Sequence, residues 1–351
     1  MRKPVTMRTL ARELGLSLSA VSKAINDYPD IRPETKTLVL NKAEELGYTP
    51  NILARNLAKK TSNFVGVVIR DVSSIYGEMF KSLNEVARRY DLHLILYDTN
   101  NDSTVEKWCI QNLIDSMAMG IVITPVSEDV SEIMEMTRGR VPVVFLGGKV
   151  TDDSVNYVCS DSEAGTEMGL DHLIGLGHGR IAMICDHKKS SSRSTKLAVY
   201  RRLMNEIGQP ERIYYGSELD GGILESGYEQ GKRLIAAGDD VTAVFVVKDI
   251  MAIGVIKAFT EAGIRVPDQI SVVGYDGIDA AALPMVELTT VTQPRKEMAD
   301  AVIGILRRHA ENSELPPEHV QIMPRLIIRK SSISKTVVPS WAREQTQFVR
   351  F

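Results

Sequence analysis

The sequence has few cysteines and no long apolar run. Its 351 residues include three cysteines, Cys109, Cys159 and Cys185, which are far apart and form no C-x-x-C pair. This pattern argues against a disulfide framework or a zinc knuckle and suits a reducing compartment. No apolar run approaches the ~18 residues that span a bilayer, and no apolar stretch follows the basic N-terminal residues as it would in a secretory signal. We therefore expect a cytoplasmic protein without a membrane partner.

Several motifs of enzyme chemistry are also missing. The sequence has no G-x-x-x-x-G-K-[S/T] phosphate loop, no G-x-S-x-G nucleophile elbow and no H-E-x-x-H among its six histidines. Gly175, Gly177 and Gly179 have the spacing of a dinucleotide loop, but they follow an expected helix and precede an expected strand, which reverses the required order. We expect no enzyme activity, no cofactor and no metal. A Rossmann-like cofactor-dependent enzyme is an alternative with similar strand–helix alternation.

The charge is unevenly distributed along the chain. Residues 1–60 hold 11 Lys/Arg and 6 Asp/Glu, a formal charge of +5, whereas the remaining residues hold 31 and 39, a charge of −8. A basic head on an acidic body is typical of a chain whose one end meets a polyanion such as nucleic acid. A chance imbalance of surface charge is the alternative.

The first sixty residues predict helices only. Thr6 can cap a first helix that Gly15 ends, and Ser17 can cap a second. Pro33 suits the first turn of a third helix, and a short fourth helix is expected at 51–58. We therefore expect residues 1–60 to form an all-helical part, distinct from the rest of the chain.

From residue 64 the apolar period changes, and short apolar runs alternate with longer amphipathic segments. The expected strands are 64–69, 92–97, 120–124, 141–146, 180–185, 243–247 and 270–274. The expected helices are 77–90, 104–117, 128–138, 163–176, 195–207, 224–237 and 250–262. This alternation predicts an α/β fold with parallel sheets, and its length of ~270 residues predicts two similar lobes.

The helical head has the small and apolar residues of a helix-turn-helix. Ala11 and Gly15 suit a close helix crossing and its turn, and Val21 can seat the second helix on the first. A plain helical hairpin is the alternative. No acidic residue occurs between Leu14 and Asn26, which favours contact with DNA. The short or basic side chains on the exposed face of the second helix are Ser17, Ser19, Ser22, Lys23 and Asn26.

These residues carry a resemblance to a known family. The runs 16–26 (LSLSAVSKAIN) and 44–57 (EELGYTPNILARNL) resemble the lactose-repressor (LacI/GalR) family of bacterial transcription regulators. The resemblance continues in order through 64–69, 177–182, 242–245, 249–254, 262–267, 271–276, 288–294 and 324–331. It implies a helix-turn-helix domain at 1–50, a hinge helix and linker at 51–62, a two-lobed, periplasmic-binding-protein-like effector-binding and dimerisation domain at 63–332, and a tail at 333–351.

The resemblance implies that a homodimer binds double-stranded operator DNA of pseudo-palindromic sequence. A tetramer is the alternative assembly. Base-reading positions correspond to Leu18, Ser19 and Lys23, and phosphate-binding positions to Ser17, Ser22, Asn26, Tyr48 and Asn51. Ala54 belongs to the implied hinge helix, in which Leu57 would be a wedge in the minor groove. Ala20 is smaller than the family's usual threonine, so the operator need not be a standard one.

In an open two-lobed α/β protein the ligand is expected at the carboxyl ends of the strands. Polar residues follow several expected strands there, and Asp276 is the best acceptor for ligand hydroxyls. The family resemblance places a small-molecule effector, a sugar or sugar phosphate, among Tyr76, Thr124, Leu146, Ser192, Lys196, Lys248 and Asp276.

Two lysines depart from the family pattern in this cleft. Lys196 replaces the usual arginine, and Lys248 stands where asparagine is common. Two lysines are compatible with an anionic effector. The alternative is that either lysine is a solvated surface residue. We expect an effector-responsive transcription regulator, and the family resemblance implies a repressor. A periplasmic-type binding protein without a DNA role is the other alternative, but it would need a signal peptide and no basic head.

Overall fold

The computed structural model describes residues 5–26, 28–48, 62–72, 75–148, 150, 152–186, 191–217 and 222–333. The chain divides into two compact units between Ser62 and Asn63. The predicted helix at 51–58 lies outside the described residues, as does the predicted tail apart from Ile333. Within the described ranges, no helix is both long and apolar enough to cross a membrane.

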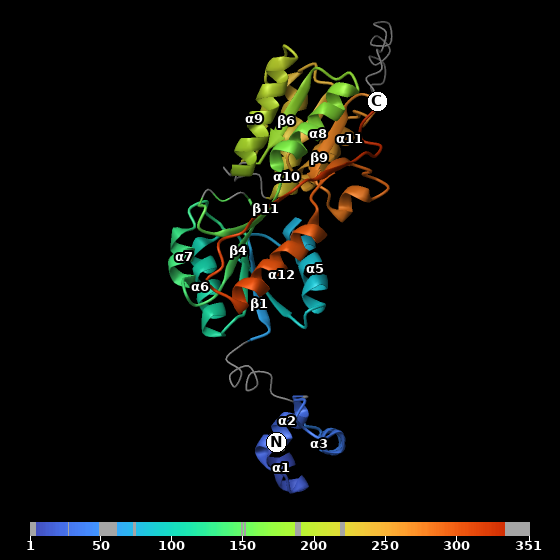
Figure 1. Ribbon diagram of the computed structural model, residues 1–351. Coiled ribbons are helices and arrows are strands. Elements are labelled where there is room, and N and C mark those ends of the chain that lie inside the picture. Colours follow the sequence, from blue (N-terminus) through green and yellow to red (C-terminus); the bar gives the residue numbers. More distant parts are fainter. Residues whose placement is uncertain are drawn as a thin grey trace. The chain divides into compact units, whose positions relative to one another are not determined.

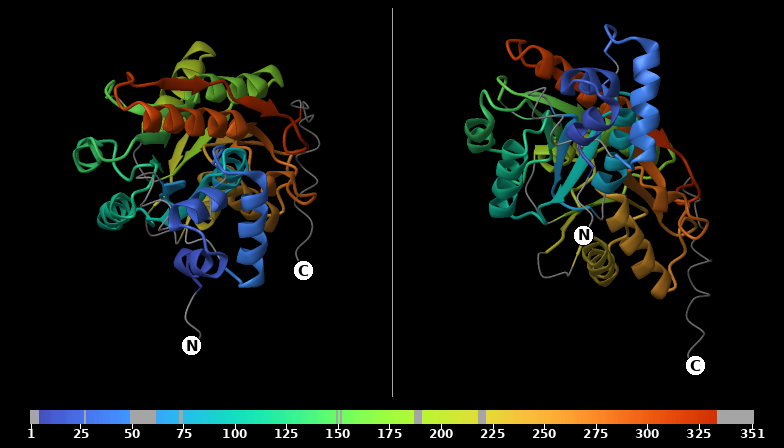
Figure 2. Two further views of the ribbon diagram at one scale, coloured as in Figure 1. Left: turned by 60° about the horizontal axis from the view of Figure 1, so that its bottom comes forward. Right: turned by 90° about the horizontal axis from the view of Figure 1, so that it is seen from below.

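The described residues of the first unit form three helices whose ends agree with the predicted caps. The helices are α1 (Met7–Leu14), α2 (Leu18–Ile25) and α3 (Pro33–Glu45). Thr6 Oγ1 accepts a hydrogen bond from Thr9 N at 3.3 Å, and Ser17 Oγ accepts one from Ala20 N at 3.1 Å. Gly15 ends α1 in the left-handed conformation, with φ of 63°. Both views in Figure 2 show α1 and α2 on the same side of α3.

A small apolar core holds these helices together. Its buried members come from all three helices and are Leu10, Val21, Ala24, Val39 and Ala43. Ala11 packs against this core as a partly buried residue, and Val21 is fully buried, as the helix-turn-helix interpretation requires. The side chains of α2 that are left outside the core are therefore available to a ligand.

The second unit contains two parallel-dominated sheets, each covered by helices. The first lobe, the N-lobe, has strands β1 (Phe64–Ile69), β2 (His93–Asp98), β3 (Gly120–Ile123), β4 (Val143–Gly147), β5 (Asn156–Ser160) and β11 (His319–Ile322). Its helices are α5 (Ile75–Arg88), α6 (Ser103–Asp115), α7 (Ser131–Thr137) and α12 (Arg295–Glu311). The strand order is β2-β1-β3-β4-β5-β11, and every pairing is parallel.

The second lobe, the C-lobe, repeats this plan. Its strands are β6 (Ile181–Cys185), β7 (Ile213–Tyr215), β8 (Ala243–Val246), β9 (Ser271–Asp276), β10 (Thr289–Thr292) and β12 (Arg325–Ile327). Its helices are α8 (Ser162–Gly175), α9 (Ser191–Glu206), α10 (Ile223–Ala237), α11 (Asp249–Glu261) and the 3-10 helix η2 (Asp279–Ala282). The order is β7-β6-β8-β9-β10-β12, in which β12 alone is antiparallel.

The chain passes between the lobes three times, because the strands and helices of each lobe are not continuous in sequence. The passages lie between β5 and α8, between β10 and α12, and between β11 and β12. Figure 1 shows the orange-red α12 and β11 within the lobe built from the blue-to-green part of the chain, and α12 packs there beside α5. The strand order of each lobe reverses next to its first strand, which is where an open α/β sheet forms its ligand crevice.

The seven predicted strands and seven predicted helices are present, with shifted ends. Sequence periodicity missed β5, β7, β10, β11, β12 and α12. The strands β7 and β12 have only three residues each, too few to display a period, and β11 is an edge strand with alternating exposure. Strand β9 extends two residues beyond its predicted end, so Asp276 is its last residue.

A close contact between α10 and α11 depends on glycine. A Cβ added to Gly254 in α11 would lie 2.1 Å from the carbonyl oxygen of Leu224 and 2.7 Å from Tyr228 N, both of which are backbone atoms. Backbone atoms of a packed helix cannot move aside without loss of packing elsewhere. Only a residue without a Cβ allows the two helices to approach this closely.

We predict that Gly254→Ala lowers the free energy of unfolding by about 1–3 kcal/mol, the usual cost of overpacking. Gly304→Ala in α12 is the matched control, because its added Cβ would meet only Arg308 Nη1, at 3.2 Å, on a flexible side chain. The control should be neutral or stabilising by up to about 1 kcal/mol, since alanine is the better helix former. Denaturant unfolding of the two variants measures this difference, and equal destabilisation would contradict the packing argument.

Candidate functional site

The face of α2 that the head core leaves uncovered is neutral to basic. Ser17, Leu18 and Ser19 are exposed, and Leu18 keeps 45% of its surface although it is apolar. Ser22 and Lys23 are partly exposed on the same helix. The exposed part of the Leu18 side chain is accessible to a partner.

Lys23 is engaged by an acidic neighbour in the head. Its Nζ forms an ion pair with Asp30, and this hydrogen bond lowers the pKa of the Asp30 carboxyl group. The Lys23 side chain stays 41% exposed, so a phosphate or base edge can compete with Asp30 for it. Asn26 Nδ2 donates to the Ser22 carbonyl oxygen at 2.8 Å, which holds its amide along the end of α2.

The remaining predicted DNA-contact residues have different positions. Tyr48 is half-buried and packs against the head core, and burial raises the pKa of its phenol. Asn51, Ala54 and Leu57 lie outside the described residues.

In the body, Asp276 occupies the carboxyl end of a central C-lobe strand, as predicted. It is buried, and its Oδ1 accepts a hydrogen bond from Gln293 Nε2 at 2.9 Å. Burial raises the pKa of Asp276, while the charges of Lys196 and Lys248 oppose this shift. Its φ of 123° is a strained backbone conformation for a residue other than glycine, and such strain is often found at functional sites.

A second acid, Asp249, positions the chain that follows Asp276 and was missed by the sequence prediction. Its buried carboxylate accepts hydrogen bonds from Gly277 N at 2.7 Å, from Ile278 N at 3.0 Å and from Thr290 Oγ1 at 2.6 Å. Burial and the nearby charge of Asp276 raise the pKa of Asp249 to about 7. An acid in the first turn of a helix, directly after an apolar strand, was the available signal in the sequence.

Lys196 lies inside the C-lobe. Its Nζ donates to the carbonyl oxygen of Val247 at 3.1 Å and lies 3.4 Å from the ring centre of Tyr275. Only 6% of the residue is exposed, so the alternative of a solvated surface lysine is wrong for this position. Burial lowers the pKa of Lys196 to about 8, although Asp276 and Asp186 act in the opposite direction.

Lys248 forms an ion pair with Asp186, a residue that the sequence prediction did not include. Lys248 Nζ lies 2.7 Å from Asp186 Oδ2, and its side chain is 32% exposed. Burial lowers the pKa of Lys248, but Asp186 outweighs this effect and leaves the pKa above its ordinary value. Asp186 directly follows β6, so the ends of β6, β8 and β9 together present these charged groups.

In the N-lobe, Arg70 contacts Tyr76 beyond the carboxyl end of β1. Arg70 directly follows β1, and its Nη2 donates a hydrogen bond to the Tyr76 hydroxyl. The guanidinium carbon lies 5.4 Å from the ring centre of Tyr76. Thr124 is buried, and its Oγ1 accepts a hydrogen bond from Arg70 N at 3.2 Å, so its hydroxyl holds the backbone of Arg70 in place.

Two further predicted effector residues have structural partners. Leu146 is buried in the apolar core of the N-lobe. Ser192 Oγ is 3.2 Å from Ser162 Oγ, a contact between the first turns of α9 and α8. The structure thus brings Lys196 and Lys248 within electrostatic reach of Asp276, and Tyr76 within reach of Lys248, at the carboxyl ends of the strands. Thr124, Leu146 and Ser192 contact the surrounding framework.

A polar contact joins the two lobes beside Asp276. Glu78 of α5 accepts a hydrogen bond from Asp279 N at 2.7 Å and forms an ion pair with Arg295 of α12. Arg295 Nη1 also donates to the carbonyl oxygen of Gly277 at 2.9 Å. The loop after Asp276 therefore contacts two N-lobe helices directly.

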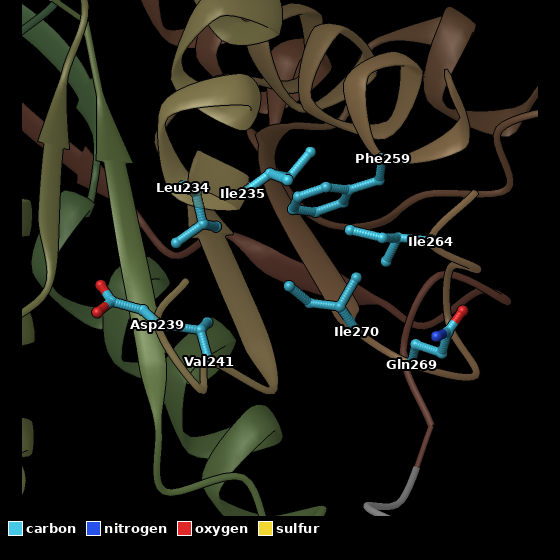
Figure 3. Close-up of a pocket in the computed structure, with 8 residues that line it drawn as sticks. All are labelled: Leu234, Ile235, Asp239, Val241, Phe259, Ile264, Gln269 and Ile270. Atoms are coloured by element: carbon cyan, nitrogen blue, oxygen red, sulfur yellow. The ribbon is translucent and has the colours of Figure 1, made fainter. Parts of the chain in front are cut away.

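A small pocket lies elsewhere in the C-lobe, and Asp239 and Gln269 are its polar lining residues. Its volume is about 220 Å³, and its walls are mainly aliphatic side chains with Phe259 (Figure 3). Val241 and Ile270, which precede β8 and β9, line it, so it lies at the amino ends of these strands. The charged groups of Lys248 and Asp276 lie at the opposite, carboxyl ends of the same strands.

Two family models match the chain. Residues 6–51 match the bacterial regulatory proteins of the lacI family, and residues 170–332 match a periplasmic binding protein-like domain. The first match contains α1–α3, and the second spans most of the C-lobe and the last elements of the N-lobe.

Proteins that are similar to this chain along nearly their whole length are transcription regulators. Catabolite control protein A of Priestia megaterium is 29% identical over 93% of this chain and 99% of its own. The repressor PurR of Photobacterium profundum is 27% identical over 93% and 98%. A crystal structure of the lac repressor dimer bound to operator and an anti-inducer has a TM-score of 0.83 and 25% identity, and covers 94% of this chain and 100% of that one. With a lacI-type DNA-binding head joined to a periplasmic-binding-protein-like body, the chain belongs to the LacI family of DNA-binding transcription regulators.

Proposed function

We propose that this protein is an effector-responsive repressor that binds a pseudo-palindromic operator as a homodimer. The observation that carries the proposal is the combination of two features in one chain. The uncovered face of α2 has no acidic residue, and the body holds opposed charged groups at the carboxyl ends of its strands. The first feature suits DNA, and the second suits a small polar ligand.

The head reads DNA through α2 in the major groove. Leu18, Ser19 and Lys23 contact base edges, and phosphates are held by Ser17, Ser22, Asn26, Tyr48 and Asn51. In the segment 51–62, Ala54 and Leu57 belong to a hinge helix in the minor groove, where Leu57 separates two base steps. Two heads on one dimer match the two half-sites of the operator.

The effector, a sugar or sugar phosphate, occupies the cleft between the lobes. Asp276 accepts hydrogen bonds from its hydroxyls, and Lys196 and Lys248 supply positive charge next to it. The loop after Asp276 is tied to α5 and α12 through Glu78 and Arg295, so a shift at Asp276 changes the contact between the lobes. This contact couples ligand binding to the arrangement of the N-lobes, and through them to the heads.

We predict that Lys23→Ala relaxes base preference at one operator position by about 1–3 kcal/mol, because a cation on α2 that contacts a base edge is lost. The measurement is binding to a set of single-base variants of an operator selected by the wild-type protein. Asp30→Ala is the matched control: it removes the partner of Lys23 and should keep base preference while strengthening binding at low salt. Unchanged base preference in Lys23→Ala would contradict this role.

We predict that Asp276→Asn abolishes the effector response and leaves operator binding without effector intact. The amide keeps the shape of the side chain but supplies a donor where ligand hydroxyls need an acceptor, at a cost of about 1–3 kcal/mol. The measurement is thermal stabilisation by the sugar or sugar phosphate that most stabilises the wild type. Asp268→Asn, at an exposed carboxylate paired with Arg265, is the control. Full stabilisation of Asp276→Asn would remove this residue from the site.

We predict that Lys196 makes stability rise with pH in the range from about 8 to 10.5. Its folded-state pKa of about 8 is below the ordinary 10.5, so in this range the unfolded chain binds more protons than the folded one. The gain is on the order of 1–3 kcal/mol relative to Lys196→Met, which has no titrating group there. Denaturant unfolding at pH 7.5, 8.5 and 9.5 measures it, and parallel pH profiles for the two proteins would refute it.

A further inference from the structure

Arg70 is a half-buried cation with an incomplete set of partners. Its Nη2 donates to the Tyr76 hydroxyl, but its buried Nε has no hydrogen-bond partner, and no carboxylate within the described ranges lies within ion-pair distance. An unpaired charge in a partly buried position costs free energy unless it is compensated. A guanidinium presents parallel N–H groups, and the groups that match this geometry are carboxylates and phosphates.

The surroundings of Asp186 show that the cleft near Arg70 favours negative charge. Burial raises the pKa of Asp186, yet Lys248, Lys196 and Arg193 together lower it below its ordinary value. Asp186 also interacts electrostatically with Arg70 from across the cleft. A half-buried carboxylate whose pKa stays below its ordinary value lies in a region of positive potential, which a ligand anion would share. At Asp276 burial prevails instead, and the pKa is raised.

These observations separate the cleft into two parts. Arg70 from the end of β1 and Lys248 from the end of β8 both face Asp186, and they come from different lobes. Asp276 and Gln293 form the other part at the end of β9, where Lys196 is the nearby cation. A ligand with an oxyanion at one end and hydroxyls at the other would satisfy both parts at once.

We propose that the effector is a hydroxylated small molecule with an oxyanion, a carboxylate or a phosphate, which Arg70 and Lys248 bind together from the two lobes. The proposal rests on the effector cleft described above and names its ligand class. The oxyanion completes the donors of Arg70, including Nε, and shares Lys248 with Asp186. Because its two cations belong to different lobes, one anion draws both lobes together. A neutral sugar leaves Arg70 uncompensated.

The test uses the full-length protein and matched sets of ligands. Each set holds a neutral sugar, its uronic acid, its aldonic acid and its 6-phosphate, for glucose, galactose, mannose and fructose where these derivatives exist. We expect at least one anionic member to stabilise the wild type in a thermal-shift assay while its neutral parent does not. A carboxylate and a phosphate of the same sugar then distinguish the two sources of the oxyanion.

The variant arm identifies the residue responsible. Arg70→Gln should weaken binding of the stabilising anion at least tenfold by calorimetry, and Lys248→Gln should weaken it as well. Arg138→Gln, at an exposed arginine that follows α7 in the same lobe, is the matched control and should bind like the wild type. Without ligand, Arg70→Gln should melt no lower than the wild type, because the substitution removes an uncompensated charge; a purely structural arginine would lower the melting temperature.

Two of the three outcomes separate this proposal from the proposed function. If neutral sugars stabilise both the wild type and Arg70→Gln, the requirement for an oxyanion is wrong, and the proposed effector cleft stands. Anion binding that persists undiminished in Arg70→Gln would overturn the role of Arg70. No stabilisation by any member of the sets would overturn both the ligand class and the sugar-related effector of the proposed function.

Discussion

The geometry of the cleft depends on one buried carboxylate, that of Asp249. It holds the first two backbone N–H groups after Asp276 and the hydroxyl of Thr290 on the neighbouring strand. A Cβ on Gly274 would lie 2.2 Å from Asp249 Oδ1, so this strand needs a glycine where the carboxylate passes. Three donors offset the cost of burying the acid, and together they keep Asp276 in its strained conformation. Helix α11, strand β9 and the loop to η2 are thus fixed to one another at the point where the ligand is expected.

The same loop makes the two lobes depend on each other. Three passages of the chain join them, and the loop after Asp276 adds contacts to Glu78 and Arg295 of the N-lobe. These polar contacts can be exchanged at little cost, whereas the apolar cores within each lobe cannot. Movement of the lobes is therefore expected at the passages and at these contacts, with each lobe moving as a rigid body.

The cleft keeps charges that reduce stability without a ligand. Lys196 is buried with a lowered pKa, and Arg70 has an unsatisfied Nε. Apolar residues of similar size would fit such positions at lower cost. Their presence at the carboxyl ends of the strands agrees with a site whose groups are completed by a bound molecule. The pocket at the opposite ends of the C-lobe strands is lined by a single charged residue, Asp239.

The sequence alone determined the elements whose signals are local. The caps at Thr6 and Ser17, the stop at Gly15 and seven strand–helix alternations follow from backbone and side-chain preferences within a few residues, and all were predicted. Family resemblance added candidate residues, of which Lys196 and Asp276 lie together in the cleft. Only the tertiary structure decided that α12 and β11 complete the N-lobe, that Asp249 holds the Asp276 loop, and that Arg70 and Asp186 share the cleft. These facts depend on contacts between residues far apart in the chain, which no local pattern of charge or hydrophobicity encodes.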